Sequence, residues 1–342
     1  MRYIGGKSHL LPEIQNLISQ RTFGVHKVID LFSGSGVVAS HFKSLNFEVI
    51  GNDFLYFAYV LSRGSTALNK VPTFEKLNLG SPIDYLNNLT FQNSNIAFED
   101  CFIYQNYSPH ENVSRMYFQN DNALKIDIVR LTIEHWKKQD LISGDEYFFL
   151  LASLISAVPY VSNITGVYGA YLKYWDKRTF NSLELVNPTN IFSNGKATFY
   201  NQDCNSLLPT ISADLLYADP PYNSRQYLPN YHILETIAKY DYPKIHGVTG
   251  MREYENQKSE FCTKRNVESA FRKMIQNANV RYIIISYNSE GLLSKEQLSS
   301  ICLDFAKKNS FFWKDIDYRR YNNVVTKFGR VTEQLYFFEK VQ

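Results

Sequence analysis

A carboxylate, two prolines and an aromatic ring follow one another in Asp219-Pro220-Pro221-Tyr222, directly after the largely apolar run 213–218. This run predicts a buried strand, and ligands of an open α/β sheet bind at the carboxyl ends of its strands. Two prolines end ladder pairing, so the chain must leave the sheet here. An acceptor carboxylate, the carbonyl of Pro220 and a flat ring together suit a planar base that carries an exocyclic amine. For this string taken alone, a structural turn is the alternative.

A second motif predicts a nucleoside-binding turn near the start of the chain. The predicted strand 26–32 is followed by Ser-Gly-Ser-Gly at 33–36 and then by an apolar helical stretch. Glycines at such a turn let a ligand approach the backbone closely. The next predicted strand, 47–53, ends in Asp53, and an acid about 20 residues past the glycines can bind ribose hydroxyls. Two glycines without a third favour a nucleoside over a nicotinamide dinucleotide.

With these motifs in this order, the chain resembles the D12 class of DNA adenine-N6 methyltransferases, in which the cofactor motif precedes the catalytic tetrad. The segments that carry the resemblance are Tyr3–Lys7, Asp30–Gly36, Asp53, Tyr200–Asp203 and Asp219–Tyr222. The resemblance implies S-adenosylmethionine as the methyl donor. It also implies that an adenine flipped out of double-stranded DNA is the acceptor.

An exocyclic adenine amine is a poor nucleophile, because its lone pair is delocalised into the ring. We expect Asp219 and the carbonyl of Pro220 to accept its two N–H groups, and Tyr222 to stack on the extruded base. The cofactor contacts that the resemblance implies are Tyr3, Lys7, Phe32, Ser33, Gly34, Gly36, Asp53, Asp203 and Asp219. Helix caps or turns are the alternative role for each acid taken singly, and a helix-start loop is the alternative for Lys7.

Predicted strands and helices alternate along most of the chain and indicate an α/β fold. The predicted strands are 26–32, 47–53, 196–202, 213–218 and 281–287, and the helices are 37–45, 231–240, 265–277 and 294–309. Extended runs at 311–321 and 331–339, with a turn at Gly329, predict a terminal hairpin. Together with the resemblance, this pattern predicts a Rossmann-like S-adenosylmethionine-dependent methyltransferase sheet with a C-terminal antiparallel hairpin.

The middle of the chain interrupts this alternation with helical patterns at 121–139 and 144–158. We therefore predict a catalytic domain in two parts, 1–60 and 196–342, with a mainly helical target-recognition domain inserted at 61–195. A helical cap over the cofactor is the alternative. Basic and aromatic residues of this insert, and a residue after the tetrad, are predicted to contact DNA: Asn163, Tyr168, Lys173, Lys177, Arg178 and Arg225.

The composition is that of a soluble globular protein, with 342 residues, 44% hydrophobic and 20% charged. The net charge of +3 is too small to indicate nucleic-acid binding by itself. The longest apolar stretch, 147–161, is too short to span a membrane, and no amino-terminal signal is evident, so we expect a cytoplasmic protein. The four scattered cysteines indicate neither disulfides nor a zinc site. His232 and Glu235 lie one helical turn apart without a third ligand, so no metal is expected.

These observations predict a site-specific adenine-N6 methyltransferase of duplex DNA. It is either the partner of a cognate restriction endonuclease or a solitary methylase. An RNA adenine-N6 methyltransferase is the nearest alternative, because the same pocket accepts an unstacked adenine from RNA. A catalytically silent DNA-binding subunit is a second alternative, which the complete tetrad disfavours. The sequence indicates neither the recognition site nor the oligomeric state.

Overall fold

The computed structural model describes residues 6–317 and 332–341, which form two compact units. The sheet unit consists of Lys7–Phe54, Asn194–Gln226 and the described part of Gln257–Gln342. The helical unit consists of Leu55–Ser193 and Tyr227–Asn256, together with Gly6. Tyr3, a predicted cofactor residue, and the predicted turn at Gly329 lie outside the described residues.

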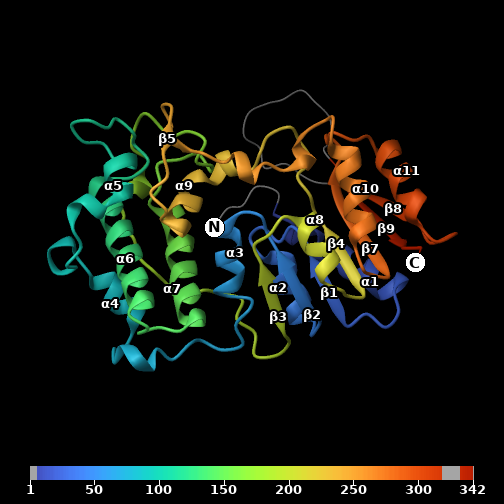
Figure 1. Cartoon of the computed structure of the whole chain (residues 1–342), viewed down its shortest axis with the longest axis horizontal. Coiled ribbons are helices and arrows are strands. Elements are labelled where there is room, and N and C mark those ends of the chain that lie inside the picture. The colour runs from blue at the N-terminus through green and yellow to red at the C-terminus, as the bar shows by residue number, and fades with distance from the viewer. Residues whose placement is uncertain (1–5, 318–331, 342) are drawn as a thin grey trace. The chain divides into compact units, whose positions relative to one another are not determined.

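The sheet unit is built on seven strands in the order β3-β2-β1-β4-β7-β9-β8 (Figure 1). Their bounds are β1 Lys27–Asp30, β2 Glu48–Asn52, β3 Ala197–Tyr200, β4 Leu215–Ala218, β7 Tyr282–Asn288, β8 Phe312–Asp317 and β9 Thr332–Glu339. Strands β1, β2, β3, β4 and β7 pair in parallel, whereas β9 pairs antiparallel with both β7 and β8. The predicted α/β sheet with a C-terminal antiparallel strand pair is confirmed. As a consequence, the first residues of β9 lie at the same edge as the last residues of the parallel strands.

Helices cover both faces of this sheet, which explains why β4 and β7 are buried along their whole length. Residues of α8 (Cys204–Leu207), α10 (Val267–Asn277) and α11 (Lys295–Phe305) share one apolar cluster with alternate residues of the strands. On the opposite face, Phe42 of α2 (Val37–Ser44) contacts Tyr217 with ring centroids 6.1 Å apart. Helix α1 (Leu11–Arg21) also belongs to this unit. The predicted helices at 37–45, 265–277 and 294–309 correspond to α2, α10 and α11.

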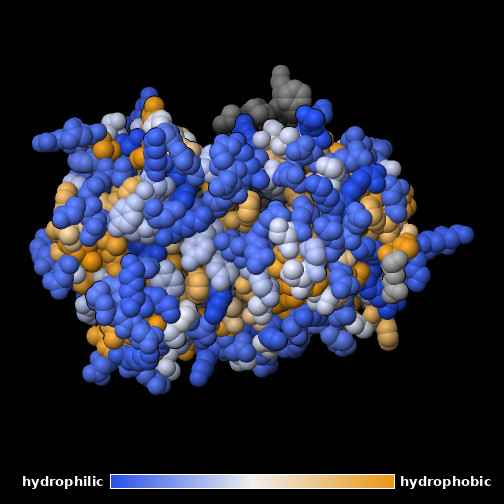
Figure 2. Space-filling model, viewed as in Figure 1, coloured by the Kyte–Doolittle hydropathy of each residue, from blue (hydrophilic) through white to orange (hydrophobic). Residues whose placement is uncertain are grey.

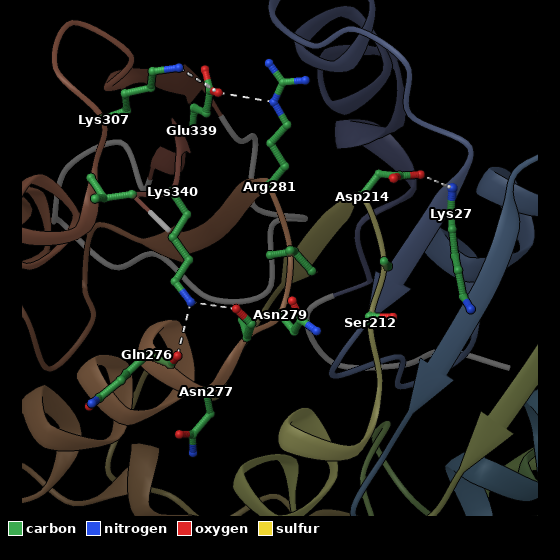
Figure 3. A pocket seen from close by; sticks show the side chains of 14 residues that line it. Lys27, Ser212, Asp214, Gln276, Asn277, Asn279, Arg281, Lys307, Glu339 and Lys340 are labelled. Carbon is green, nitrogen blue, oxygen red and sulfur yellow. Dashed lines mark hydrogen bonds and ion pairs between the residues drawn. The ribbon is translucent and has the colours of Figure 1, made fainter.

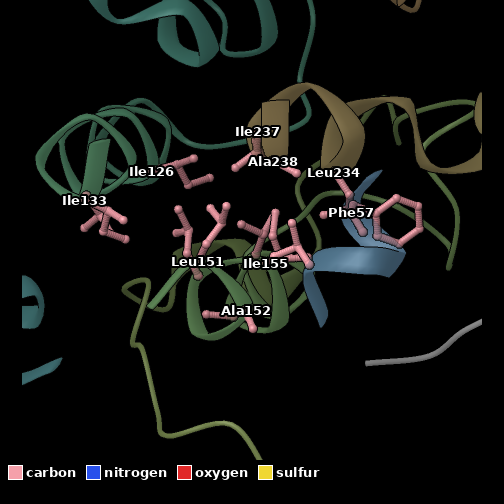
Figure 4. Close-up of a cluster of buried hydrophobic side chains, with 14 of the residues drawn as sticks. Phe57, Ile126, Ile133, Leu151, Ala152, Ile155, Leu234, Ile237 and Ala238 are labelled. Atoms are coloured by element: carbon pink, nitrogen blue, oxygen red, sulfur yellow. The ribbon is translucent and has the colours of Figure 1, made fainter. Parts of the chain in front are cut away.

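The helical unit contains α3 (Tyr56–Arg63), α4 (Pro82–Asn88), α5 (Phe102–Tyr107), α6 (Asn120–Lys138), α7 (Gly144–Ala157) and α9 (Leu228–Lys239). Apolar side chains of α3, α6, α7 and α9 meet in its core (Figure 4). Gly64, directly after α3, permits a close approach to α7, because an added Cβ would lie 2.1 Å from the carbonyl oxygen of Phe148. A two-stranded sheet, β5 (Ile245–His246) with β6 (Met251–Arg252), completes the unit.

The observed units differ from the predicted domain boundaries by a few residues at 55–60 and 194–195, and by a whole segment after the tetrad. The prediction assigns all of 196–342 to the catalytic domain, whereas residues 227–256 cluster with the helical unit. Helix α9 explains the difference, because it packs against α3 and α7. In addition, the Glu235 carboxylate accepts hydrogen bonds from the backbone N–H groups of Tyr56 and Phe57 at the start of α3. The role of the insert in target recognition stays a prediction.

The visible surface is mainly hydrophilic, and its apolar residues form small scattered patches (Figure 2). Among the residues that the structure describes, no helix has both the length and the apolar character needed to cross a bilayer.

Candidate active site

The two predicted motifs lie at one edge of the sheet. Strands β1 and β4 are neighbours in parallel register, with Asp30 opposite Tyr217, and the Leu31 N–H donates to the Tyr217 carbonyl at 3.1 Å. The glycine turn that follows β1 and the tetrad that follows β4 therefore leave the sheet side by side. This is the arrangement that the sequence predicts for a shared binding site.

The turn after β1 has the conformation that its glycines permit. Gly34 and Gly36 have φ values of +52° and +76°, a region that costs other residues roughly 1–2 kcal/mol. The Gly34 N–H donates to Asp53 Oδ2 at 2.7 Å, and the Ser33 N–H donates to the Asn52 carbonyl at 2.8 Å. Asp53, predicted to hold ribose hydroxyls, thus also fixes the turn.

Asn52, which the sequence analysis does not single out, ties three strand ends together. Its amide donates to the Leu31 carbonyl at 3.3 Å and to the Gln202 carbonyl at 3.1 Å, and its side-chain oxygen accepts from the Gln202 N–H. A buried asparagine at the end of a central strand is the signal that could have identified it.

Asp30 is buried at the end of β1, and among the described residues neither oxygen of its carboxylate has a hydrogen-bond partner of normal geometry, although the Ala39 N–H is close enough to favour its ionised form. Burial, with a further contribution from the nearby charge of Asp219, raises the pKa of Asp30 to about 8. A buried acid without a well-formed hydrogen bond destabilises the protein when it ionises. It therefore offers an unsatisfied acceptor beside the glycine turn.

Replacing Asp30 by Asn should stabilise the protein increasingly as the pH rises. In the unfolded chain this carboxyl ionises near the ordinary aspartate pKa of 3.8, whereas in the folded protein it keeps its proton up to about pH 8, so the wild type loses stability across this interval. Asparagine carries no such charge. Thermal unfolding from about pH 5 to 9 without added ligand should show a difference in midpoint that grows to several degrees. A difference that does not change with pH would contradict this account.

Lys7 joins the acid of the tetrad to a second acid that the sequence analysis does not identify. Its Nζ lies 3.1 Å from Asp219 Oδ1 and 3.0 Å from Glu333 Oε2. The Lys7, Asp219 and Glu333 side chains are 4%, 19% and 7% exposed, so the three charges interact with little screening by water. Burial raises the pKa of Asp219 to about 6, against the opposing effect of Lys7. Burial alone would lower the pKa of Lys7, but the two carboxylates outweigh it and raise that pKa above its ordinary value.

The remaining predicted residues of the sheet unit lie around this centre. The Tyr222 carbonyl accepts from the Leu292 N–H at 2.8 Å and from the Tyr287 hydroxyl at 3.4 Å, which fixes the end of the tetrad. The Phe32 ring packs edge-on against Phe261 at 5.3 Å. Pro220 is buried.

Asp203 and Arg225 have simpler surroundings. Asp203 caps α8, since its Oδ1 accepts from the N–H groups of Asn205 and Ser206. Both bonds use the same oxygen, and the predicted contact with a cofactor amine stays a prediction. Arg225 is exposed, and its backbone N–H donates to Asn223 Oδ1 at 2.9 Å.

The predicted DNA contacts of the helical unit fall into an exposed and a buried group. Lys173, Lys177 and Arg178 are exposed. Asn163 and Tyr168 are buried and bind their own unit. The amide of Asn163 donates to the Leu172 carbonyl and its oxygen accepts from the Asp176 N–H. The Tyr168 hydroxyl lies 2.9 Å from Ser162 Oγ. The backbone carbonyl of Tyr168 accepts from the Tyr117 hydroxyl and lies 2.9 Å from His232 Nε2. The Asn163 and Tyr168 side chains therefore hold the backbone of the segment around 162–176, next to the exposed basic residues.

Sequence reasoning missed three exposed aromatic side chains beside these basic residues. Tyr160, Tyr174 and Phe180 are exposed large hydrophobic residues of the helical unit. Tyr160 and Arg178 also line a cavity of about 580 Å³ in that unit. Aromatic rings next to basic groups are typical of surfaces that contact nucleic acids.

A larger hollow of about 1200 Å³ lies at the opposite edge of the sheet, at the amino ends of β1, β4 and β7 (Figure 3). Its charged groups are engaged in the fold. Glu339 binds Arg281 and Lys307, both at 3.1 Å. Lys340 donates to the carbonyls of Gln276 and Ala278 at the end of α10. The hollow lies at the amino end of β4 and the tetrad at its carboxyl end, so we do not assign the hollow to the methyl-transfer site.

Comparison with known proteins agrees with the geometry. Residues 3–301 match the family described as D12 class N6 adenine-specific DNA methyltransferase. The chain belongs to this family.

Several proteins that are similar to this chain are named Type II methyltransferases or modification methylases. The chain is 44% identical over 94% of its length to Type II methyltransferase M.FokI of Planomicrobium okeanokoites, and covers 50% of that protein. It is 42% identical over 99% of its length to modification methylase StsI of Streptococcus sanguinis, and covers 52% of it. It thus spans about half the length of these two relatives. Type II methyltransferase M.NlaIII of Neisseria lactamica is 36% identical, with 99% of each chain covered.

Proposed function

We propose that this protein transfers a methyl group from S-adenosylmethionine to N6 of an adenine flipped out of double-stranded DNA, as the modification enzyme of a restriction–modification system. The observation that supports this most strongly is the position of Asp219. Its carboxylate lies at the sheet edge that also carries the glycine turn, and one of its oxygens is held by Lys7. Membership of the D12 family supplies the reaction class.

The residues at the glycine turn fit S-adenosylmethionine, which supplies an electrophilic methyl group when bound. Gly34 and Gly36 leave the backbone open to a ligand, and Asp53 provides a carboxylate that suits ribose hydroxyls. Asp30 adds a buried carboxyl that would ionise when it binds the ammonium of an amino acid, because the positive charge lowers its pKa. We also assign Phe32 and Ser33 to the cofactor surface and Asp203 to the cofactor adenine.

In the proposed reaction the chain orients the target amine rather than forming a covalent bond to it. Asp219 Oδ1 faces Lys7, which leaves Oδ2 to accept one amine N–H. The carbonyl of Pro220 accepts the other, and the Tyr222 ring stacks on the base. These contacts align the amine nitrogen with the methyl group, and such alignment accounts for much of a rate enhancement. The proton is lost after transfer, once the nitrogen carries a positive charge.

Methyl transfer should decline below about pH 6. Protonation of Asp219, whose pKa burial raises to about 6, replaces an anionic acceptor with a neutral group. The acidic limb of the kcat/KM profile for DNA, which reports ionisation in the protein before DNA binds, should therefore have a midpoint near this pKa when measured from about pH 5 to 9. A rate that is flat down to about pH 5 would exclude this role for Asp219.

The helical unit is the proposed DNA-recognition part. Lys173, Lys177 and Arg178 would contact phosphates or guanine edges, and Tyr160 and Phe180 offer rings for contacts with bases. Arg225 is assigned to the DNA as well. A cognate restriction endonuclease is the proposed biological partner, and the cytoplasm the proposed location.

Incubation with tritiated S-adenosylmethionine and separate pools of duplex DNA and single-stranded RNA tests the proposal. Label should enter the DNA and be recovered as N6-methyldeoxyadenosine after digestion. Label in RNA alone would assign the protein to RNA methylation. DNA binding without label in either pool would support a catalytically silent subunit.

A further inference from the structure

Glu333 lies next to the acid of the tetrad but belongs to neither motif. Its Oε2 is 3.0 Å from Lys7 Nζ, which is itself 3.1 Å from Asp219 Oδ1. We propose that Glu333 is a positioning residue of the methyl-transfer site: it holds Lys7 away from one oxygen of Asp219 and keeps the site anionic. This inference rests on the proposed function.

The sheet holds Glu333 firmly in this position. It pairs with Asn288 across the antiparallel strands β7 and β9, which places the start of β9 at the carboxyl edge of β7. Asn288 Nδ2 donates to Glu333 Oε1 at 3.3 Å, and Asn288 Oδ1 accepts from the Glu290 N–H at 2.9 Å. Each oxygen of Glu333 thus has its own partner, so the direction of the carboxylate toward Lys7 is fixed.

The charge balance shows what Glu333 adds. Lys7 and Asp219 alone would form a neutral pair, whereas the second carboxylate leaves the trio with one net negative charge. Methyl transfer from a sulfonium to an amine moves positive charge onto the amine nitrogen. An anionic group placed in a buried site before the reaction stabilises such charge more strongly than water does.

Glu333 also limits how tightly Lys7 binds the tetrad. An ammonium has three N–H donors, and the carboxylate partners of Lys7 among the described residues are one oxygen each of Asp219 and Glu333. Without Glu333, Asp219 would be the one anionic partner that the described residues offer Lys7, and Lys7 would compete with the target amine for it. Because Lys7 is shared between Asp219 and Glu333, Asp219 Oδ2 can accept a hydrogen bond from the target amine.

Replacing Glu333 by Gln removes the charge but keeps the shape. We expect kcat at about pH 8 to fall about tenfold or more, with the Kd for S-adenosylmethionine changed by less than about threefold. The acidic limb of the kcat/KM profile should move to lower pH by roughly half a unit or more, because a like charge no longer opposes ionisation of Asp219. Glu333→Asp keeps the charge and should leave the limb near its wild-type position.

Several titratable groups surround this carboxyl, and the variants leave them in place. Besides Lys7, Asp219 and Glu333 themselves, the titratable groups of the described residues that interact with this trio are Asp30, Tyr217 and His9. The matched control is Glu339→Gln at the other end of β9, where Glu339 binds Arg281 and Lys307 (Figure 3). This variant should keep the wild-type kcat and pH profile. A Glu333→Gln protein with an unchanged acidic limb would overturn the inference, even if it were less stable.

A measurement without turnover separates this inference from the proposed function. In protein labelled with ¹³C-aspartate, the Asp219 carboxyl resonance can be assigned with Asp219→Asn and then titrated. Glu333→Gln should lower its midpoint, and an equal midpoint in both proteins would contradict the inference. Failure of the wild type to methylate DNA would instead contradict the proposed function.

Discussion

Replacing Asp219 by Ala should reduce methyl transfer to duplex DNA about a thousandfold, which corresponds to roughly 4 kcal/mol of transition-state stabilisation. The substitution removes the anionic acceptor that orients the amine, and the loss of one such oriented group typically costs about 10²- to 10³-fold or more. Affinity for S-adenosylmethionine should change by only a few fold, because the glycine turn and Asp53 are untouched. Single-turnover rates and calorimetric titration of the cofactor measure the two quantities.

The fold should tolerate this change, because Lys7 keeps Glu333 as a charged partner at 3.0 Å. Asp214→Ala is a matched control at the other end of β4. Its carboxylate accepts from the backbone N–H groups of His26 and Lys27 at 2.8 Å, so its loss should lower stability but not the rate per folded molecule. Normal turnover in Asp219→Ala would remove this residue from the reaction.

Replacing Tyr222 by Ala should lower kcat/KM for duplex DNA by on the order of 10- to 100-fold. Stacking of a base on an aromatic side chain contributes about 1–3 kcal/mol, and the extruded adenine would lose this contact. Tyr222→Phe keeps the ring and should stay within about threefold of the wild type. The backbone of residue 222 should remain in place in both variants, because its carbonyl is held by the Leu292 N–H.

The two variants are compared by measuring kcat/KM on a duplex that the wild type methylates. Equal losses in Tyr222→Ala and Tyr222→Phe would point to the hydroxyl rather than the ring. No loss in Tyr222→Ala would show that the base is held elsewhere.

The sequence predicts the parallel part of the fold well, because buried strands and amphipathic helices leave strong local patterns. The apolar runs at 26–32 and 281–287 correspond to β1 and β7, and the helix predicted at 144–158 to α7. The motifs could be placed at one edge for the same reason, since both follow buried parallel strands. Glu333 could not, because its position depends on the pairing of β9 with β7, and spacing along the chain does not encode that register.

Packing decides the other differences between prediction and structure. A tyrosine in a glycine-rich segment can stack on a base or fill a core, and for Tyr168 the structure shows the second. The segment 227–256 follows the tetrad directly, yet α9 joins the helical unit because its apolar face matches α3 and α7. Asp30 belongs to a predicted motif, but its lack of a well-formed hydrogen bond among the described residues appears only in three dimensions.

The most direct test of the central claim is long-read methylation mapping of DNA from cells that express this chain, beside cells that express Asp219→Ala. The proposed site predicts N6-methyladenine at one recurring sequence context in the first DNA and none at that context in the second. Methylated cytosine, or the same methylated adenines with both proteins, would contradict the claim that Asp219 orients an adenine amine for transfer.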